Sequence, residues 1–153
     1  MIIAVSISSS RILHECKDQT SHDLQAMRSR GAEGTETIYD DWVITDDNYD
    51  DIYFPLQEAG ADLYHGLRTL LRSFSSGKDI IRIEIDCARE DAYSQEILES
   101  FARQYFKFRL LGWWYTYRDA DLANTYLTRA NNVVNDIFGH CVPRTGTLQQ
   151  RYF

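Results

Sequence analysis

The sequence predicts a mainly helical α+β domain, an antiparallel bundle of three to four helices with a small sheet of short strands. Segments with apolar residues three and four positions apart predict the helices, and alternating segments predict the strands. With 153 residues, 44% of them hydrophobic and only 2 prolines, the chain has the size and composition of one globular domain. We expect residues 1–139 to form a single helical domain with this sheet, and residues 140–153 to form an extended C-terminal arm.

The first strand is predicted at residues 2–8, where isoleucine and valine alternate with small residues. Serines follow and can cap a helix, which the apolar spacing predicts over residues 11–28. Two glycines and the lack of large apolar residues mark residues 29–37 as a loop. Residues 38–44 return to alternation and predict a second strand.

A long helix is predicted from Thr45 to about Phe74, because apolar residues follow the helical spacing there. Pro55 lies inside this segment and cannot donate the amide hydrogen bond of a helix interior. Either the helix therefore kinks near Asp51, or a short first turn precedes a helix that begins at Phe54.

The isoleucine-rich segment 80–86 alternates again and predicts the third strand of the sheet. The next helix is expected to begin near Asp91, and Gly112 weakens it close to its end. A last amphipathic helix is predicted over residues 122–137, ended by Gly139.

The segment 103–112 (RQYFKFRLLG) and the aromatic residues that follow it are the most informative feature of the chain. They hold more aromatic surface than one face of an isolated helix buries in a domain of this size. Such an excess indicates a partner, because aromatic side chains anchor protein interfaces. The interface residues that we predict are Trp113, Trp114, Tyr117, Arg144, Tyr152 and Phe153.

Charge is distributed unevenly along the chain. Residues 1–100 carry 9 Lys and Arg against 20 Asp and Glu, whereas residues 101–153 carry 7 against 3. Opposite charges on different parts of one surface favour head-to-tail association of identical copies, which closes into rings. Alternatively, the two segments interleave in space and the charges average out. The predicted arm contains two arginines and no acidic side chain, which favours an arm that orders against a neighbour.

The sequence predicts neither a membrane span nor a signal peptide, because no apolar run is long enough and the first residues lack a basic start. Cys16, Cys87 and Cys141 are odd in number and form no CxxC pair, which indicates free thiols that pack in a reducing compartment. The four histidines are scattered and belong to no four-ligand zinc motif. No nucleophile motif or phosphate-binding glycine loop is present, so we expect no enzymatic activity, cofactor or metal.

Six aspartates crowd into residues 40–51 and offer the oxygen ligands that Mg²⁺ or Ca²⁺ prefer. The spacing of an EF-hand fails, because Asp51 stands where that loop requires glycine and Gln57 where it requires glutamate. We favour a structural interpretation, in which these carboxylates cap the first turns of the following helix. A divalent-metal-dependent hydrolase that uses the cluster from Asp40 to Asp51 is kept as an alternative function.

Two further patterns suggest chemistry on nucleic acids. Asp79, Glu84 and Asp86 resemble the paired carboxylates of a metal-dependent nuclease, but the lysine that usually follows them is absent. Basic and aromatic residues alternate in segment 103–109, as in proteins that stack bases and bind phosphates. On a helix these side chains point in all directions, and the chain as a whole is acidic, so we favour neither interpretation.

The order of elements from Thr45 to Arg144 is distinctive. An acidic-capped helix (TDDNYDDIYFPLQEAGADLYHGL) is followed by an isoleucine strand, an aromatic helix ending in FRLLGWWY, a final helix and a basic tail with PRTG. In this layout the chain resembles the small head-to-tail connector, or adaptor, proteins of tailed bacteriophages, especially those that form a ring beneath the portal.

The resemblance implies a virion structural protein whose copies form a ring that connects the portal to neck and tail components around the DNA channel. The implied partners are further copies of itself, the portal and other neck or tail proteins, with non-specific proximity to DNA and no membrane. The implied location is the virion, and the host cytoplasm during assembly. The sequence also leaves open a cytosolic protein-protein interaction module that uses the same aromatic patch and has no catalytic activity.

Overall fold

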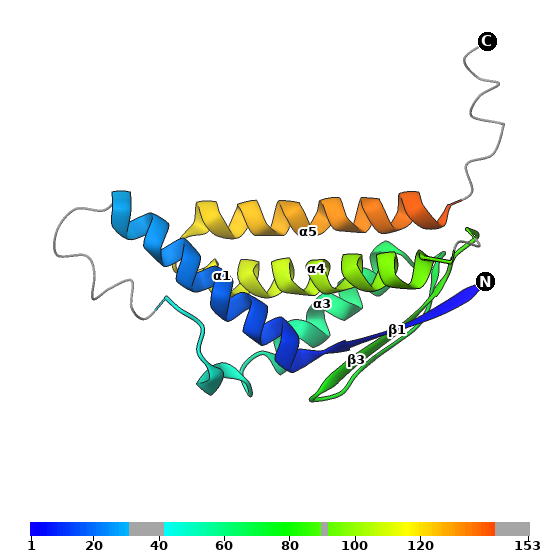
Figure 1. Cartoon of the computed structure of the whole chain (residues 1–153), viewed down its shortest axis with the longest axis horizontal. Helices are drawn as coiled ribbons and strands as arrows, with labels where there is room; N and C mark the ends of the chain where they lie inside the picture. Colours follow the sequence, from blue (N-terminus) through cyan, green and yellow to red (C-terminus); the bar gives the residue numbers. More distant parts are fainter. Residues whose placement is uncertain (31–41, 90–91, 143–153) are drawn as a thin grey trace, which may run out of the picture.

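A computed structural model describes residues 1–30, 42–89 and 92–142, and these form a mainly helical α+β fold (Figure 1). The elements in chain order are β1 (Ile2–Ser8), α1 (Ser9–Arg30), the short 3₁₀ helix η1 (Asp46–Asn48), α3 (Tyr53–Gly66), β2 (Leu71–Ser76), β3 (Ile80–Asp86), α4 (Ser94–Tyr115) and α5 (Ala120–Cys141). The predicted fold class is confirmed: the described residues contain four α-helices and a three-stranded antiparallel sheet. No helix among these residues is long and apolar enough to cross a membrane.

β3 is the middle strand of the sheet and pairs antiparallel with β1 on one side and β2 on the other. The predicted strands 2–8 and 80–86 are therefore confirmed. Alternate side chains of a strand point to opposite faces, so aligned apolar residues share one face. The buried face of β1 and β3 consists of Ile3, Val5, Ile7, Ile81, Ile83 and Ile85.

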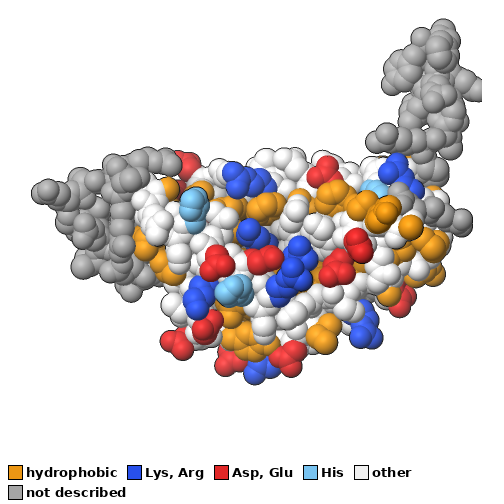
Figure 2. All heavy atoms as spheres, in the orientation of Figure 1, with side chains coloured by type: hydrophobic (Ala, Val, Ile, Leu, Met, Phe, Trp, Pro, Cys, Tyr) orange, Lys and Arg blue, Asp and Glu red, His pale blue; other side chains and the backbone are white. Residues whose placement is uncertain are grey.

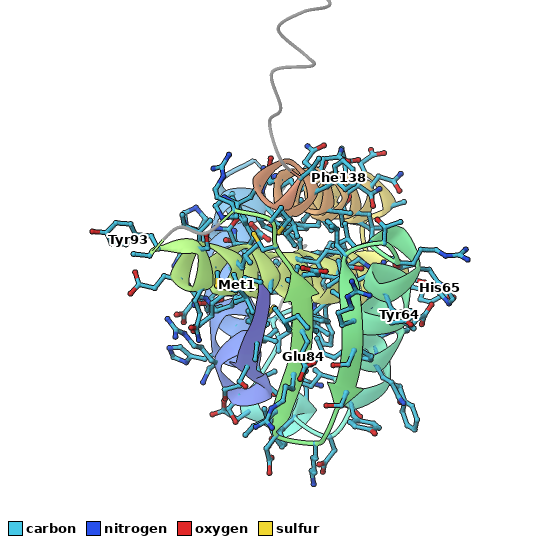
Figure 3. All side chains as sticks on the ribbon, turned by 90° about the vertical axis from the view of Figure 1, so that its right-hand side faces the viewer. Met1, Tyr64, His65, Glu84, Tyr93 and Phe138 are labelled. Atoms are coloured by element: carbon cyan, nitrogen blue, oxygen red, sulfur yellow. The ribbon has the colours of Figure 1, made fainter. Side chains whose placement is uncertain are left out.

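α4 is the central helix of the fold. It contacts β1 of the sheet, α5 on the opposite side, and α1 and α3 on its flanks, and Figures 1 and 3 show this layered arrangement. Towards its C-terminal end α4 carries large apolar and aromatic side chains on several sides, which suits such a position. Tyr105, Phe106, Trp114 and Tyr115 are therefore all buried although they point in different directions. Much of the aromatic surface that predicted a partner is thus covered by the chain's own elements.

The predicted strand at residues 38–44 is wrong over its described part. Residues 38–41 lie outside the described residues, and residues 42–44 form no strand. Ile44 is buried, and its backbone N–H donates to the hydroxyl oxygen of Thr20 in α1 at 3.0 Å. Ile44 is therefore buried by packing against α1 and the core, rather than by pairing in the sheet.

The strand that completes the sheet, β2, lies in a segment that was predicted as helix. α3 ends at Gly66, and the register of β2 with β3 shifts between Leu71 and Ser73. Because of this irregularity, Leu71 and Phe74 pair with Ile85 and Ile83 on the buried face. Their separation of three residues imitates helical spacing, which explains the incorrect prediction.

Of the two alternatives for Pro55, the structure supports the second. η1 forms a short first turn, and α3 begins at Tyr53, so Pro55 lies in the first turn of α3. Amide groups in a first turn have no partner within the helix, so proline is tolerated there. Further along α3, Gly60 allows close approach to β2, since a Cβ atom there would lie 1.9 Å from the ring of Phe74.

α5 runs antiparallel to α4 and does not end at Gly139 as predicted. It continues to Cys141, and the Nε2 atom of His140 lies 3.1 Å from the hydroxyl oxygen of Ser94 at the start of α4. This tertiary contact holds the last turn of α5 despite the glycine. Residues 140 and 141 are therefore helical, and residues 143–153 of the predicted arm lie outside the described residues.

Candidate interaction surface

The structure separates the two adjacent tryptophans. Trp114 is only 6% exposed: its Nε1–H donates to the carbonyl oxygen of Trp42 at 2.6 Å, and the Arg118 guanidinium lies 3.8 Å from the centre of its ring system. Trp113 is 41% exposed and Tyr117 is 95% exposed. The other predicted interface residues, Arg144, Tyr152 and Phe153, lie outside the described residues.

Trp113 lies in a groove where α3, α4 and α5 meet, which we call the Trp113 groove. Its volume is about 170 Å³, and its lining residues are Pro55, Glu58, Arg109, Trp113, Thr116 and Leu127. Phe54 precedes Pro55 in the chain and is 75% exposed, while the exposed Tyr117 follows Thr116. Three of the groove's lining residues, Pro55, Trp113 and Leu127, are apolar, and the other three are polar or charged.

Gly112 brings the helices of this groove together. A Cβ atom at this position would lie 2.5 Å from Cδ2 and 2.7 Å from Cγ of Leu127. Glycine therefore allows α5 to approach α4 so closely that Leu127 lines the groove. The next residue, Trp113, is turned by about 100° around the helix axis and points away from this contact.

The charged residues of the groove differ in their partners. Nη2 of Arg109 donates to Oδ2 of Asp62 at 2.5 Å, and Nη1 donates to the hydroxyl oxygen of Tyr105 at 3.2 Å. Burial opposes the charge of Arg109, but the bond to Asp62 and the neighbouring negative charges outweigh it and raise the pKa of Arg109. Glu58 is exposed, and its charge also contributes to the raised pKa of Arg109, but among the described residues Glu58 forms no ion pair or hydrogen bond. The groove thus has a neutralised arginine and an available carboxylate.

The acidic and basic parts of the sequence interleave in space over the described residues. Arg103 pairs with Glu15 at 3.2 Å, and Arg109 pairs with Asp62. Figure 2 shows acidic and basic side chains next to one another on the face that it displays. The uneven charge along the sequence is therefore largely averaged over the described residues. This agrees with the interpretation that the acidic and basic segments interleave in space.

The aspartates of segment 46–51 make structural contacts. Asp46 pairs with Lys17 at 3.3 Å and Asp50 pairs with Lys78 at 3.0 Å. Thr45 caps η1 in a reciprocal capping box. Within residues 1–30, 42–89 and 92–142, no group of three or more His, Cys, Asp or Glu side chains could hold a metal ion; residues 40 and 41 of the cluster lie outside these ranges.

His140 and Ser94 are close enough to resemble a base and a nucleophile, but their hydrogen bonds oppose this role. Nη1 of Arg89 lies 3.5 Å from Nδ1 of His140. Because a guanidinium only donates, Nδ1 accepts and Nε2 carries the proton toward Ser94. Ser94 in turn donates to the carbonyl oxygen of Arg89 at 3.4 Å. The cluster joins the start of α4 to the end of α5 and leaves the serine unactivated.

The three cysteines are free thiols and are buried, as the sequence predicted. Burial raises the pKa of Cys141 to about 12 and raises that of Cys16 even more strongly. Since the thiolate is the reactive form, these side chains act in packing.

Sequence reasoning missed Pro55, Glu58 and Leu127 as lining of one groove, and it missed Phe54 as an exposed ring. Phe54 carried a signal, since it is a large apolar residue off the apolar stripe formed by Leu56, Ala59 and Leu63. The meeting of three helices at Trp113 left no signal in the sequence. No protein-family model, no curated protein and no solved structure matches the chain.

Proposed function

We propose that this chain is a structural protein without enzymatic activity that assembles with copies of itself into a ring. In the connector proteins that its layout resembles, such a ring joins the portal of a tailed bacteriophage to neck and tail components around the DNA channel. The observation that carries the proposal is the Trp113 groove with its exposed Trp113 ring; Phe54 and Tyr117, each next in the chain to a lining residue, are exposed as well.

Exposed aromatic side chains are typical anchors of protein interfaces. Complete burial of a large apolar side chain contributes about 1.5 to 3 kcal/mol, and the residues with the largest contributions to binding are enriched in Trp, Tyr and Arg. Trp113 and Arg109, which both line the groove, match this composition. The described residues of one subunit leave the Trp113 ring 41% exposed.

A ring also requires that each subunit use two different surfaces, one for each neighbour. The Trp113 groove is one such surface. The basic segment 143–153, which follows α5, is the second surface in our proposal. A contact between two unlike surfaces can be repeated from each copy to the next. The chain of copies closes into a ring when the rotations between neighbours add up to a full turn.

Native mass spectrometry and light scattering over a range of protein concentrations test the proposal, with electron microscopy to detect rings. We expect oligomers for the unmodified chain and smaller species for Trp113→Ala and Tyr117→Ala. Phe138→Ala is the matched control, because Phe138 is also an exposed ring (46%) but lies near the far end of α5. A chain that stays monomeric at all concentrations would contradict the proposal.

The same groove supports the second function, a protein-protein interaction module with one specific partner. Such a module is a monomer or dimer in light scattering and forms no higher-order ring. The oligomeric state of the purified chain therefore separates the two functions.

A further inference from the structure

We infer that the Trp113 groove binds residues Arg151 to Phe153 of a second copy of the chain. The inference rests on the proposed self-assembly and identifies the contact through which it occurs. It follows from the size of the groove, its charge and the position at which the described chain ends.

The size of the groove suits a side chain rather than a whole element. At about 170 Å³ it is smaller than the roughly 300 to 1,000 Å³ of pockets that enclose drug-sized ligands. Pro55, Trp113 and Leu127 give it apolar walls. An aromatic ring such as that of Tyr152 or Phe153 provides the matching apolar group, and rings pack favourably edge to face against tryptophan.

The charge of the groove suits an arginine next to that ring. Glu58 is exposed and forms no ion pair with a described residue, whereas Asp62 already binds Arg109. Segment 143–153 contains Arg144 and Arg151 and no acidic side chain. An arginine and a carboxylate form two parallel hydrogen bonds in their best geometry, so Arg151 is a suitable partner for Glu58.

A second aromatic and acidic pocket is less suitable. It is lined by Tyr49, Asp50, Tyr53 and Lys78. Nζ of Lys78 lies 3.0 Å from Oδ1 of Asp50 and 5.9 Å from the centre of the Tyr49 ring. A cation of the same chain therefore already occupies the position that an arginine would take.

Chain geometry favours a second copy over the same copy. α5 ends beside Ser94 at the start of α4, whereas Trp113 lies 19 positions further along α4, about 28 Å away along the helix axis. The nine Cα-to-Cα steps from Val142 to Arg151 span at most about 30 to 32 Å when fully extended. The backbone of Arg151 would lie beside Trp113 of its own copy only with the chain between them almost fully extended, while a neighbouring copy places no such demand on it.

Charge reversal in the full chain tests the contact. Glu58→Arg and Arg151→Glu should each weaken self-association at least tenfold, measured as the dissociation constant by analytical ultracentrifugation. The double variant, which carries both changes, should recover most of the association. An equal mixture of the two single variants should also recover association, because both contacts between unlike variants join opposite charges, whereas each variant alone joins like charges.

Controls separate this contact from a general effect of charge or folding. Glu96→Arg makes the same change on an exposed residue at the other end of α4. This variant should associate like the unmodified chain. Phe153→Ala and Tyr152→Ala remove a ring without touching the described core, so they report on the contact even if Glu58→Arg fails to fold.

The results that would contradict binding of residues 151–153 in the Trp113 groove differ from those that would contradict self-assembly. If the unmodified chain assembles and all the single variants assemble equally well, the segment is not the occupant, and self-assembly still stands. If the unmodified chain is monomeric at every concentration, both proposals fail. If it is monomeric but Arg151→Glu changes the fluorescence of Trp113, the segment binds its own groove and the second copy is excluded.

Discussion

The buried tyrosines each keep a partner for their hydroxyl group. Oδ2 of Asp23 accepts from the hydroxyls of Tyr115 at 3.1 Å and Tyr126 at 2.5 Å, which ties α1 to α4 and α5. The hydroxyl of Tyr105 donates to the carbonyl oxygen of Ala59 at 2.8 Å and accepts from Arg109 at 3.2 Å. Tyr105 thus connects the core to a residue that lines the Trp113 groove.

Tyr105→Phe tests this connection. The substitution removes the buried hydrogen bond to the Ala59 carbonyl and the acceptor of Nη1 of Arg109, so we expect a loss of about 1 to 2 kcal/mol in the free energy of unfolding at neutral pH. Urea unfolding followed by circular dichroism measures it. Tyr117→Phe is the control, because Tyr117 is 95% exposed and its substitution should leave stability unchanged.

The effect of Tyr105 on stability also depends on pH. Burial raises the pKa of Tyr105 to about 12, although the charge of Arg109 opposes this, whereas the phenol titrates near 10 in an unfolded chain. The native state therefore holds the phenol proton more tightly than the unfolded state does. The stability that Tyr105 contributes through this proton is fully present below pH 10 and is lost as the pH rises toward 12. The difference between the unmodified chain and Tyr105→Phe should shrink over that interval; a constant difference would contradict the assignment.

At the scale of elements, the close contact of α4 and α5 depends on a small residue. Gly112→Ala places a Cβ atom against Leu127, and such overpacking typically costs about 1 to 3 kcal/mol, more than the roughly 1 kcal/mol gained by replacing glycine within a helix. We expect a lower free energy of unfolding and a displaced Leu127 in the groove. Gly139→Ala in α5 is the control, since nothing lies within 4 Å of its Cβ position, and it should be neutral or stabilising.

The start of α5 depends on a capping residue. Oδ1 of Asp119 accepts the backbone N–H of Leu122 at 3.1 Å. Asp119→Ala removes this acceptor, and we expect a loss of about 1 kcal/mol, visible as a lower midpoint of thermal unfolding. Asp121→Ala is the control, because Asp121 is an exposed aspartate of the same turn whose side chain does not cap the helix. An equal loss of stability in Asp121→Ala would show that the negative charge, and not the capping bond, is responsible.

Local patterns also explain which elements the sequence predicts correctly. β1 and β3 follow strict alternation because one face of each packs on the core, so their bounds agree with prediction. β2 does not follow this alternation, because the register of its pairing with β3 shifts at Arg72. The pattern of a strand that contains such an irregularity is decided by its partner and cannot be inferred from its own residues.

At the scale of the whole molecule, the described residues form a complete core without the last eleven. Helices and sheet enclose it from Ile3 to Cys141. Removal of residues 143–153 should therefore leave the thermal midpoint and the circular dichroism spectrum unchanged while it prevents assembly, as native mass spectrometry would show. Normal assembly by the shortened chain would contradict a role for this segment.

The sequence by itself determined the fold class, the strands at 2–8 and 80–86, and the helical nature of the segments before and after Gly112. These properties depend on the spacing of apolar residues along each segment, which can be read from the sequence without knowing the tertiary structure. Only the tertiary structure decided that Trp114 is enclosed while Trp113 is exposed, and that Pro55 and Leu127 line the same groove. Exposure depends on which distant segments cover a side chain, and α4 is covered by segments from both ends of the sequence.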